Sequence, residues 1–491
     1  MTARLSRTGL AGLAADRDVA RPGYDRAGLQ PAILHLGLGA FFRAHGALYT
    51  EDVLNARGGG WGILGVSLQR PDQRDRLVPQ GGLYTALESA SGGECARIVG
   101  NLLGVLVAPE DPAAVLGRLA DPVTRIVSLT VTEKGYCHDP ATGRLHADHP
   151  DIRHDLAHPD APRSAVGFLA AGLRLRRDRG LAPFTVLCCD NLPGNGALVA
   201  GLVRDFAALG DGALAGWIEA AVPFPSTMVD RIVPALAEAD LAAARRLTGL
   251  DDHAPVRHEP FRQWVIEDRF VDGGRPDWAC AGAQFVADVA PFEHMKLRLL
   301  NGAHSALAYL GYLAGHETVA EAAGDPVLSA YLGRLWDEVR PVVPPPPGQD
   351  LAGYTRSLAE RFANPAIRHR TWQIAMDGSQ KLPQRLLSSI RERRARGLPV
   401  PALALAVAAW ARYVGGTDEH GRPIDVRDPL AGFLRGRLDG AGADPAARIR
   451  ALLGVEAVFG ADLPADPTFA AAVTDAYARL TRDGARAAAR G

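Results

Sequence analysis

The sequence predicts a parallel α/β domain followed by a mostly α-helical domain. Over roughly the first 280 residues, apolar strand-like runs alternate with helix-like runs, which is typical of parallel sheets with crossover helices. After about Phe285 the chain is rich in Ala, Leu and Arg, and its apolar residues follow a helical period. Because 491 residues exceed one ordinary core, we expect two domains, over residues 1–285 and 286–491.

Each element of the first domain is predicted from an apolar run that ends at turn residues. The predicted strands cover residues 32–37, 62–68, 125–131 and 184–189. A helix-like run follows the first strand through Val53–Leu54, and another covers Ala165–Leu175. This alternation predicts a parallel sheet in the first domain.

The second domain is predicted as a succession of helices. Helical periodicity covers residues 295–315, 327–340, 351–363, 381–396, 401–413, 446–458 and 467–488. The segment Pro341–Gly348 contains five prolines, and we expect it to be a stiff surface loop within this domain.

Composition narrows the class of protein. A hydrophobic content of 47% and a net charge of -1 describe a soluble protein that does not bind nucleic acid or anionic membranes by bulk charge. The five cysteines include no Cys-x-x-Cys pair, and Cys188 and Cys189 lie in an apolar run that predicts burial. No signal peptide or membrane-spanning run is recognised. We expect a cytoplasmic protein, a monomer, with a small-molecule partner.

A glycine pair follows the first predicted strand. Gly37 and Gly39 stand before a helix-like run, as in half of the dinucleotide-binding fingerprint, and Ala40 and Phe41 follow them. Glycines permit a tight turn and let a pyrophosphate approach the backbone at the start of a helix. Phe42 stands where the third glycine of the fingerprint would be. No clear acid ends the second strand, so the residues leave NAD and NADP open.

Three lysines, Lys134, Lys296 and Lys381, stand against fifty-one arginines. Arg replaces Lys readily at a surface, but not where a side chain must release its proton or act as a compact point charge. The three lysines are therefore the first candidates for chemistry.

The segment around Lys296 carries the clearest chemical pattern. At 100° per residue, Glu293, Lys296, Asn301 and His304 lie within one broad arc of a helix, among apolar residues. Desolvation lowers the pKa of a lysine toward the range where it serves as a general acid or base. Asn301 and His304 can bond a substrate hydroxyl. The alternative is a helix whose polar residues face solvent.

The catalytic motifs of other dehydrogenase classes are absent or poorly placed. No Tyr is followed four residues later by Lys, and His316-Glu317 has no cysteine after it to complete a zinc site. A His-rich stretch holds His146, His149, His154 and His158. It lies among Pro and Asp, and we interpret it as a loop with no metal site. No metal is expected.

Several motifs together resemble the polyol-specific long-chain dehydrogenase/reductase family, also called the mannitol dehydrogenase family. The resemblance runs from about Ile33 to the C-terminus. It rests on residues 37–45, Val131-Thr-Glu-Lys-Gly135, Cys189-Asp-Asn191, Pro225-Ser-Thr-Met-Val-Asp-Arg231, residues 296–304 and Asp377-Gly-Ser-Gln-Lys381.

The resemblance implies a Rossmann-type first domain and metal-independent hydride transfer in carbohydrate metabolism. It implies Lys296 as the acid/base, with Asn191 and Asn301 polarising the carbonyl. Glu293 resembles the family's proton-relay carboxylate. His304 and Lys381 would position the substrate.

The resemblance also implies a cofactor site and leaves one substrate contact open. The cofactor residues would be Gly37, Gly39, Ala40, Phe41, Glu133, Val229 and Asp230. Gln373 stands where mannitol dehydrogenases carry Arg, and Arg370 lies one turn upstream. Lys381, Arg370 and Arg262 are candidates to bind a substrate carboxylate.

Segments such as 259–268 and 369–374 favour the fructuronate reductase branch. That branch implies NAD-dependent interconversion of D-mannonate and D-fructuronate. Interconversion of D-mannitol and D-fructose, or of another polyol or hexuronate, is the alternative within the family. A catalytically silent sugar- or nucleotide-binding protein is the alternative from another class; it predicts a broken catalytic set, whereas Lys296, Asn191, Asn301 and His304 are all present.

Overall fold

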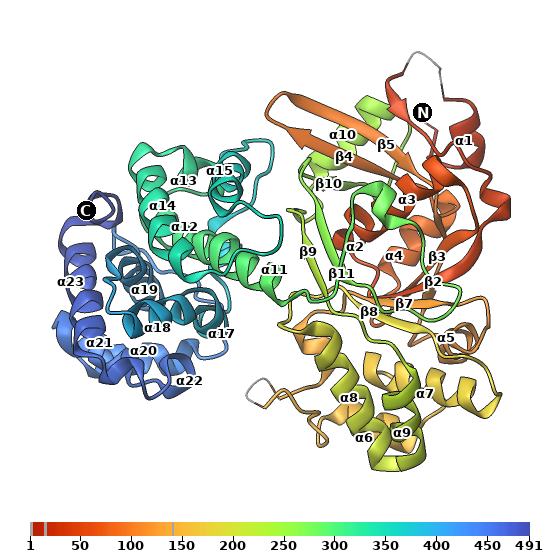
Figure 1. The fold of residues 1–491 in the computed structure, drawn as a ribbon. Helices are drawn as coiled ribbons and strands as arrows, with labels where there is room; N and C mark the ends of the chain where they lie inside the picture. Colours follow the sequence, from red (N-terminus) through yellow and green to blue (C-terminus); the bar gives the residue numbers. More distant parts are fainter. Residues whose placement is uncertain (1–2, 14–16, 140–141) are drawn as a thin grey trace. The chain divides into compact units, whose positions relative to one another are not determined.

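The computed structural model describes residues 3–13, 17–139 and 142–491. It divides the chain into two compact units, Met1–Ala290 and Pro291–Gly491 (Figure 1). The first unit is an α/β domain and the second is helical, so the predicted fold class is confirmed. Among the described residues, no helix is both long enough and apolar enough to cross a bilayer.

The main sheet of the first unit has the strand order of a dinucleotide-binding fold. Over the described residues its five strands lie in the order β6 (Leu102–Val107), β3 (Trp61–Ser67), β2 (Gln30–Leu36), β7 (Ile126–Leu129), β8 (Thr185–Cys188). All neighbouring pairs are parallel. The chain order reverses between β2 and β7, and ligands of such sheets bind beyond the carboxyl ends of the strands at this point. The sequence pattern predicted every strand except β6.

Alternate residues of these strands face two separate cores. Leu34, Leu36 and Val127 pack against four helices on one face: α5 (Pro112–Leu119), α7 (Ala165–Asp178), α8 (Asn195–Gly210) and α9 (Gly212–Ala221). Ile33 and Ile126 pack on the other face with α3 (Gly46–Arg57). Burial on both faces explains the continuous apolar runs in the sequence.

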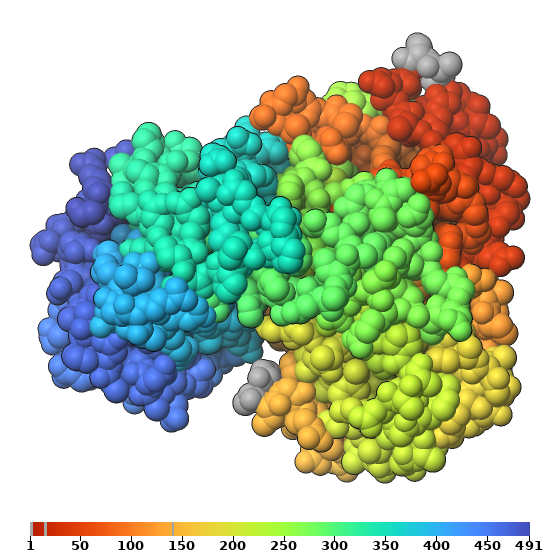
Figure 2. Space-filling view, in the orientation of Figure 1, coloured from red at the N-terminus to blue at the C-terminus, as the bar shows by residue number. Residues whose placement is uncertain are grey.

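Two smaller sheets complete the first unit. One has the order β1 (Val19–Ala20), β5 (Gly93–Val99), β4 (Tyr84–Ala90), β10 (Val256–His258), and the other β12 (Gln284–Val286), β11 (Gln263–Glu267), β9 (Thr227–Asp230). On the face of this unit shown in Figure 2, the green segment that follows α10 (Glu238–Thr248) lies between the red and orange N-terminal part and the yellow part. These strands are mostly short, and the sequence pattern did not predict them.

The remaining elements of the first unit are short. They are α1 (Arg7–Ala11), η1 (Arg26–Gly28), α2 (Ala40–Ala44), α4 (Asp72–Leu77), η2 (Val78–Gln80), η3 (Glu133–Tyr136), α6 (Pro150–Ala157) and η4 (Trp278–Ala281). The prediction of a loop over the His-rich stretch is wrong for α6. Pro150 occupies its first turn, and His149 accepts from the Asp151 N–H as its N-cap, so the Pro and Asp begin a helix there.

The second unit is helical. Helices cover each run predicted from the sequence, and further helices over 319–324, 371–375 and 431–440 were not predicted. The helices are α11 (Ala290–Met295), η5 (Lys296–Asn301), α12 (Gly302–Leu313), α13 (Val319–Gly324), α14 (Pro326–Val339), η6 (Arg340–Val342), α15 (Leu351–Phe362), α16 (Thr371–Ala375), α17 (Gly378–Leu382), η7 (Pro383–Leu387), α18 (Ser388–Ala395), α19 (Pro401–Val414), α20 (Ala431–Gly440), α21 (Pro445–Leu453), α22 (Glu456–Phe459), η8 (Leu463–Ala465), α23 (Pro467–Asp483) and α24 (Ala485–Ala488). The helix predicted over 446–458 is two helices, because α21 ends at Leu453 with Gly454 as its C-cap. The helix predicted over 467–488 is also two helices, α23 and α24, divided at Gly484.

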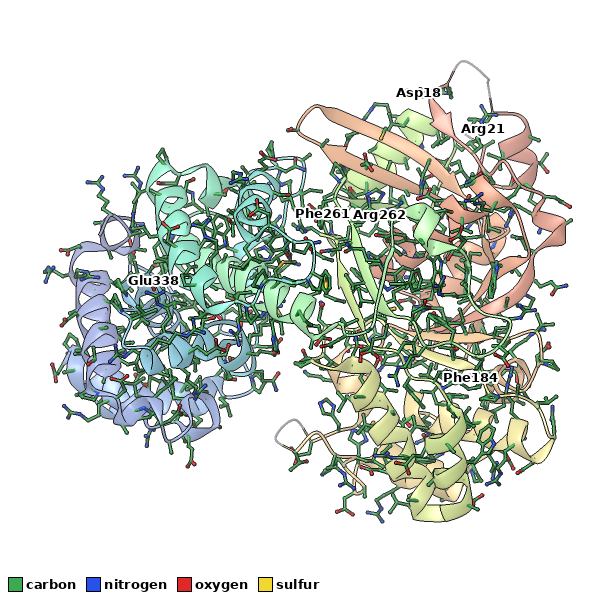
Figure 3. All side chains as sticks on the ribbon, viewed as in Figure 1. Asp18, Arg21, Phe184, Phe261, Arg262 and Glu338 are labelled. Atoms are coloured by element: carbon green, nitrogen blue, oxygen red, sulfur yellow. The ribbon has the colours of Figure 1, made fainter. Side chains whose placement is uncertain are left out.

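Two central helices, α12 and α19, are buried along nearly their whole length. Glu338, labelled in Figure 3 within this unit, accepts from the Ala402 and Leu403 N–H groups at 2.7 and 3.0 Å. These are donors of the first turn of α19 that the helix itself leaves unbonded. Burial raises the pKa of the Glu338 carboxyl. The buried carboxyl thus fixes α19 against α14.

Candidate functional site

The turn after β2 has the two glycines that the sequence singles out. Gly37 has a φ of +87°, and a Cβ on it would lie 2.2 Å from the Thr130 carbonyl oxygen, so only glycine fits. Gly39 has extended backbone, and a Cβ there would meet only the Gly37 carbonyl oxygen at 3.8 Å. The protein itself does not require a glycine at position 39. A small residue at that place fits a ligand, such as a dinucleotide pyrophosphate, that approaches the backbone closely.

His35 ties the glycine turn to the neighbouring strand. Its two ring nitrogens lie 2.9 Å from the hydroxyl oxygens of Ser128 and Thr130, and the Thr130 hydroxyl donates to the Gly37 carbonyl oxygen at 2.9 Å. The ring also stacks on Phe42 at 3.4 Å. Burial lowers the pKa of His35 to about 3, so the ring is neutral at physiological pH. These bonds hold the turn where the strand order reverses.

Asp190 holds the loop that carries Glu133. Its carboxylate, at the end of β8, accepts from the Val131 and Thr132 N–H groups at 2.9 and 3.1 Å and from the Tyr136 hydroxyl at 2.6 Å. Thr132 has a φ of +66°, a conformation that β-branched residues rarely adopt, and these bonds maintain it. Glu133 follows on η3 and is exposed.

Asn195 joins the end of β8 to β9. Its side chain donates to the carbonyl oxygens of Asp190 and Thr227 at 3.0 and 2.9 Å and accepts from the Thr227 N–H at 2.9 Å. Asn191 therefore lies on a fixed turn beside β9, whose Val229 and Asp230 are buried. Sequence reasoning missed Asn195, which follows the recognised Cys189-Asp-Asn191 motif by four residues.

Ala40 and Phe41 form the first turn of α2. Both are half-buried, and the Phe41 ring stacks on His45 at 5.1 Å. A nitrogen of His45 lies 2.9 Å from the Gln263 carbonyl oxygen, which connects α2 to β11.

Lys296 begins a π-helical turn, which the sequence pattern did not predict. The turn covers Lys296–Asn301 between α11 and α12, and the Gly302 N–H bonds the Leu297 carbonyl oxygen five residues back. In an α-helix, residues five apart are separated by about 140°. An i→i+5 turn brings residues five apart nearly onto one face of the helix. Lys296 and Asn301 therefore point in more similar directions than they would on the regular α-helix predicted from the sequence. Lys296 is only 7% exposed, and Glu293 on α11 is also buried.

A second π-turn, η7, contacts the first. A Cβ on Gly302 would lie 2.7 Å from the Arg385 carbonyl oxygen, so glycine permits the close approach of the two turns. The Arg385 guanidinium donates to the Ser305 hydroxyl at 3.1 Å, and Trp336 Nε1 donates to the Leu299 carbonyl oxygen at 2.9 Å. These contacts stabilise the irregular backbone at Lys296.

His304 lies in a buried, basic environment. It is 7% exposed, stacks on Phe362 at 5.0 Å, and meets His369 edge-on at 5.0 Å. Burial lowers its pKa well below the usual value, and His369 and the charges of Arg385, Arg361 and Lys381 lower it further. Burial also lowers the pKa of His369 to about 4. Both rings are neutral at physiological pH.

Both histidines keep unused bonding capacity. Over the part of the chain that the structure describes, His304 Nε2 and His369 Nδ1 are buried atoms with no hydrogen-bond partner. Buried polar atoms are nearly always bonded to protein, water or a ligand, so a ligand beside these two neighbouring rings could bond both nitrogens.

Sequence reasoning missed His369, Arg361 and Arg385 at this place. Arg385 had a signal, because it follows Lys381 by one turn in the helix predicted over 381–396. Arg361 and His369 approach His304 only through tertiary packing.

Lys381 is positioned by the motif that contains it. Its ammonium donates to the Met376 carbonyl oxygen at 2.6 Å. Gly378 lies so close to α12 and α19 that a Cβ would be 2.5 Å from Trp410 Nε1 and from the Tyr309 hydroxyl oxygen. Ser379 donates to the Asp428 carboxylate through its N–H at 2.7 Å and its hydroxyl at 2.6 Å. The Gly-Ser pair is thus explained by packing, and it fixes the turn that carries Lys381.

The other predicted cations have partners within their own units. Arg370 forms an ion pair with Glu317 and is partly exposed, and Gln373 is half-buried on α16. Arg262, labelled in Figure 3, pairs with Asp52 at 2.5 Å and lies over the Tyr49 ring at 4.1 Å. These contacts give Arg262 a structural role in the first unit.

The predicted residues divide between the units. Gly37, Gly39, Ala40, Phe41, Glu133, Asn191, Val229 and Asp230 lie in the first unit. Glu293, Lys296, Asn301, His304, Arg370, Gln373 and Lys381 lie in the second.

Known proteins match the chain along most of its length. The family model described as Mannitol dehydrogenase Rossmann domain matches residues 31–280, and Mannitol dehydrogenase C-terminal domain matches residues 288–481. D-mannonate oxidoreductase of Escherichia coli (strain K12) is 49% identical, over 95% of this chain and 97% of the relative. Mannitol 2-dehydrogenase of Pyricularia oryzae is 39% identical, over 99% of this chain and 98% of the relative. The structure of Pseudomonas fluorescens mannitol 2-dehydrogenase in ternary complex with NAD and D-mannitol superposes with a TM-score of 0.89, at 41% identity, covering 99% of both chains.

Proposed function

Because the chain belongs to the mannitol dehydrogenase family, we propose that it interconverts D-mannonate and D-fructuronate with NAD as cofactor. Membership makes it an oxidoreductase of the polyol and sugar-acid dehydrogenase class. The D-mannonate oxidoreductase that is 49% identical supports the choice of substrate. The turn at Gly37 and Gly39 supports the dinucleotide, since one glycine is required by the fold and the other leaves room for a ligand.

In the proposed reaction, Lys296 moves the proton. When bound, NADH supplies the hydride that the keto carbon accepts. The ammonium of Lys296 gives a proton to the carbonyl oxygen as it becomes a hydroxyl, and neutral Lys296 takes that proton back in the oxidative direction. Asn191 and Asn301 donate hydrogen bonds to the same oxygen and stabilise its developing charge. Glu293 returns the proton to Lys296, and no metal is required.

The supporting residues have separate tasks. The dinucleotide is held by Gly37, Gly39, Ala40, Phe41, Val229 and Asp230. Glu133 adjusts the charge beside it. Lys381 and His304 position the substrate, and Arg370 and Gln373 contact its far end. The neutral ring of His304 bonds a substrate hydroxyl with Nε2, the atom that has no partner among the described residues.

The observation that carries the choice of an acidic substrate is the D-mannonate oxidoreductase that is 49% identical over 95% of this chain. The surroundings of His304 agree with this choice. Besides burial, the groups that lower the pKa of His304 are His369, Arg385, Arg361 and Lys381. The two arginines and the lysine make this place basic, which suits a substrate that carries a carboxylate.

The second candidate is interconversion of D-mannitol and D-fructose. It is favoured by the mannitol 2-dehydrogenases that are 39% and 41% identical to the chain. The residue at position 373 argues against this second candidate. Mannitol dehydrogenases carry Arg at this place in an otherwise similar pattern, whereas this chain has Gln373.

A substrate panel decides between the two. NADH oxidation is measured with D-fructuronate, D-tagaturonate and D-fructose in parallel, and kcat/KM is compared. We expect kcat/KM for fructuronate to exceed that for fructose by at least a hundredfold. If fructose equals or exceeds both acids, the acidic substrate is wrong.

A matched pair of variants tests the role of the cations. Arg385→Gln should lower kcat/KM for both substrates, because Arg385 also supports the turn at Lys296 through Ser305, and should lower kcat/KM for fructuronate about tenfold more, as expected for a lost charged contact. Arg391→Gln is the control, because Arg391 pairs with Asp462 at 2.6 Å near the surface of the same unit. Equal losses for both substrates in Arg385→Gln would contradict a carboxylate contact.

A further inference from the structure

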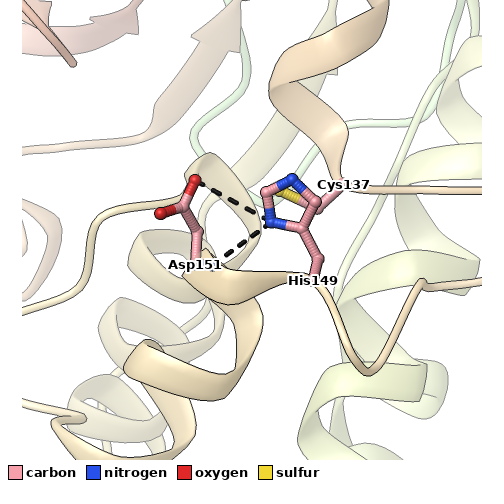
Figure 4. Close-up of side chains that lie close together, drawn as sticks. All are labelled: Cys137, His149 and Asp151. Carbon is pink, nitrogen blue, oxygen red and sulfur yellow. Dashed lines mark hydrogen bonds and ion pairs between the residues drawn. The ribbon is translucent and has the colours of Figure 1, made fainter.

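Three metal-ligand side chains meet in the first unit, away from the residues assigned to the reaction. Cys137, His149 and Asp151 each direct one donor atom toward the others, and these atoms all lie within 4.8 Å of one another (Figure 4). Over the part of the chain that the structure describes, no other group of three or more His, Cys, Asp or Glu side chains comes as close.

The local backbone brings Cys137 next to the start of α6. Cys137 has a φ of +50°, in the left-handed region that side chains other than glycine rarely occupy. Its carbonyl oxygen accepts from the His146 N–H at 2.9 Å, and the His146 carbonyl oxygen accepts from the His149 N–H at 2.9 Å. His138 and Leu145 form an isolated antiparallel bridge in between. The chain therefore turns back so that Cys137 and His149 lie together although they are twelve residues apart.

The spacing of the donors is close to that of a zinc site. Zn²⁺ binds thiolate sulfur at about 2.3 Å and imidazole nitrogen or carboxylate oxygen at about 2.0–2.2 Å, so its tetrahedral ligands are about 3.5 Å apart. His149 Nδ1 and a carboxylate oxygen of Asp151 are 3.8 Å apart. The donor atoms lie within 4.8 Å of one another, so side-chain rotations that shift them by about 1.3 Å or less would bring all three to the spacing of zinc ligands.

His146 can supply a fourth ligand. It is exposed, and its ring centre lies 6.2 Å from that of His149, with the ring planes at 80°. Two imidazoles on one tetrahedral ion have ring centres about 5 Å apart. Rotation of the His146 side chain suffices to close the difference, because the ring is not buried.

We propose that Cys137, His149 and Asp151, with His146 as the fourth ligand, form a structural Zn²⁺ site. A set of one thiolate, imidazoles and one carboxylate selects Zn²⁺ over Mg²⁺ and Ca²⁺, which take oxygen ligands. A bound ion would take the Nδ1 lone pair that now accepts from the Asp151 N–H at 3.2 Å, so it would replace the N-cap bond of α6. That N-cap bond is the simpler role of His149. It does not account for the approach of Cys137, which is buried beside the ring.

A bound ion would cross-link the segment 137–151. Cys137 directly follows η3, which carries Glu133, so the ion would also stiffen the connection to the proposed cofactor site. It takes no part in the reaction, because none of its ligands is among the residues assigned to substrate or cofactor. We therefore expect Zn²⁺ to raise the melting temperature and to leave turnover of the intact enzyme almost unchanged.

The test is binding of Zn²⁺ and Co²⁺ to the chelator-treated full-length protein. Titration calorimetry should show one Zn²⁺ per chain, and Co²⁺ should give a thiolate-to-cobalt charge-transfer absorption. Cys137→Ser should abolish that absorption, and His149→Gln and Asp151→Asn should each weaken Zn²⁺ binding at least tenfold. Cys95→Ser and His158→Gln are matched controls, since neither residue belongs to the group, and both should bind as the original protein does.

Two results would overturn the proposal. One is the absence of Zn²⁺ binding at micromolar concentrations by the original protein. The other is a Co²⁺ thiolate absorption that persists in Cys137→Ser or disappears in Cys95→Ser. Since circular dichroism checks folding in each variant, and His149→Gln and Asp151→Asn leave the buried thiol in place, a folding defect in Cys137→Ser alone does not obscure the outcome.

Discussion

Two buried histidines, one in each unit, differ in what their nitrogens bond. His35 bonds Ser128 and Thr130 and so fixes the glycine turn between β2 and β7. His304 is nearly as buried, but its Nε2 has no partner among the described residues. Burial lowers the pKa of both rings, so both are neutral. The first unit thus uses its histidine to hold the glycine turn, whereas Nε2 of the histidine in the second unit can bond the proposed substrate.

Complete hydrogen bonding assigns a buried polar residue to the fold, whereas an unbonded buried atom is one that a ligand can bond. A buried polar group without a protein partner costs about 1–3 kcal/mol unless a water or a ligand bonds it. A residue whose bonds are complete has a structural explanation already.

The two glycines of the turn after β2 should respond to substitution most strongly and in different ways, one in stability and the other in NADH binding. Gly37→Ala should cost about 3 kcal/mol of unfolding free energy or more, because the new Cβ meets the Thr130 carbonyl oxygen and the φ is positive. Gly39→Ala should fold within about 1 kcal/mol of the original, yet lose at least tenfold in NADH affinity. Denaturant unfolding and NADH fluorescence titration measure the two quantities. Normal NADH binding by Gly39→Ala would remove the reason for placing a pyrophosphate at this turn.

The next effect compares the histidines directly. His35→Leu should cost about 2–3 kcal/mol of unfolding free energy, because the buried Ser128 hydroxyl and the half-buried Thr130 hydroxyl each lose a bond to the ring. His304→Leu removes Nε2, which has no partner among the described residues, so it should destabilise the protein less than His35→Leu does while lowering kcat/KM by tenfold or more. The comparison fails if His304→Leu destabilises the protein as much as His35→Leu does.

The smallest effect is in the pH dependence of stability, where the two histidines should behave alike. The folded-state pKa of His35 is about 3 and that of His304 is also low, whereas an unfolded His titrates near pH 6.5. Below about pH 6.5 the unfolded chain takes up protons that the folded chain does not, so unfolding free energy falls as pH falls.

Each histidine contributes about 1.4 kcal/mol per pH unit to that slope. His35→Leu and His304→Leu should each make the slope between pH 6 and pH 4.5 shallower by this amount. Urea unfolding at several pH values measures it, with His158→Leu, an exposed histidine, as the control. An unchanged slope in both variants would mean that neither ring is held neutral.

The sequence predicted the fold where residue periodicity is unambiguous. Strands β2, β3, β7 and β8 carry continuous apolar runs because both faces of the sheet are covered. Strand β6, Leu102–Val107, was missed although it is apolar, and the hairpin of β4 and β5 was missed because its burial does not alternate regularly. Strands of three to five residues such as β10, β11 and β12 are set by their partners, so they have no periodicity of their own to detect.

For the candidate site, the sequence indicated which side chains could carry out the chemistry, but not how the backbone arranges them. Lys296, Asn301 and His304 were identified by residue type and spacing, but their positions were drawn on a regular α-helix. The π-turn leaves no signature in residue periodicity, since it depends on the close approach of η7 at Gly302 and on the bond from Trp336. The basic environment of His304 likewise depends on α15 and on the segment before α16, which are distant in sequence.

In the proposed reaction, Lys296 is the group that exchanges a proton with the substrate oxygen while hydride is transferred. The most direct measurement is turnover of Lys296→Ala with NADH and D-fructuronate, alongside NADH binding by the same variant. We expect kcat to fall by about 10²–10⁴-fold with NADH affinity changed less than threefold. A variant that turns over at a rate near the original would contradict the account.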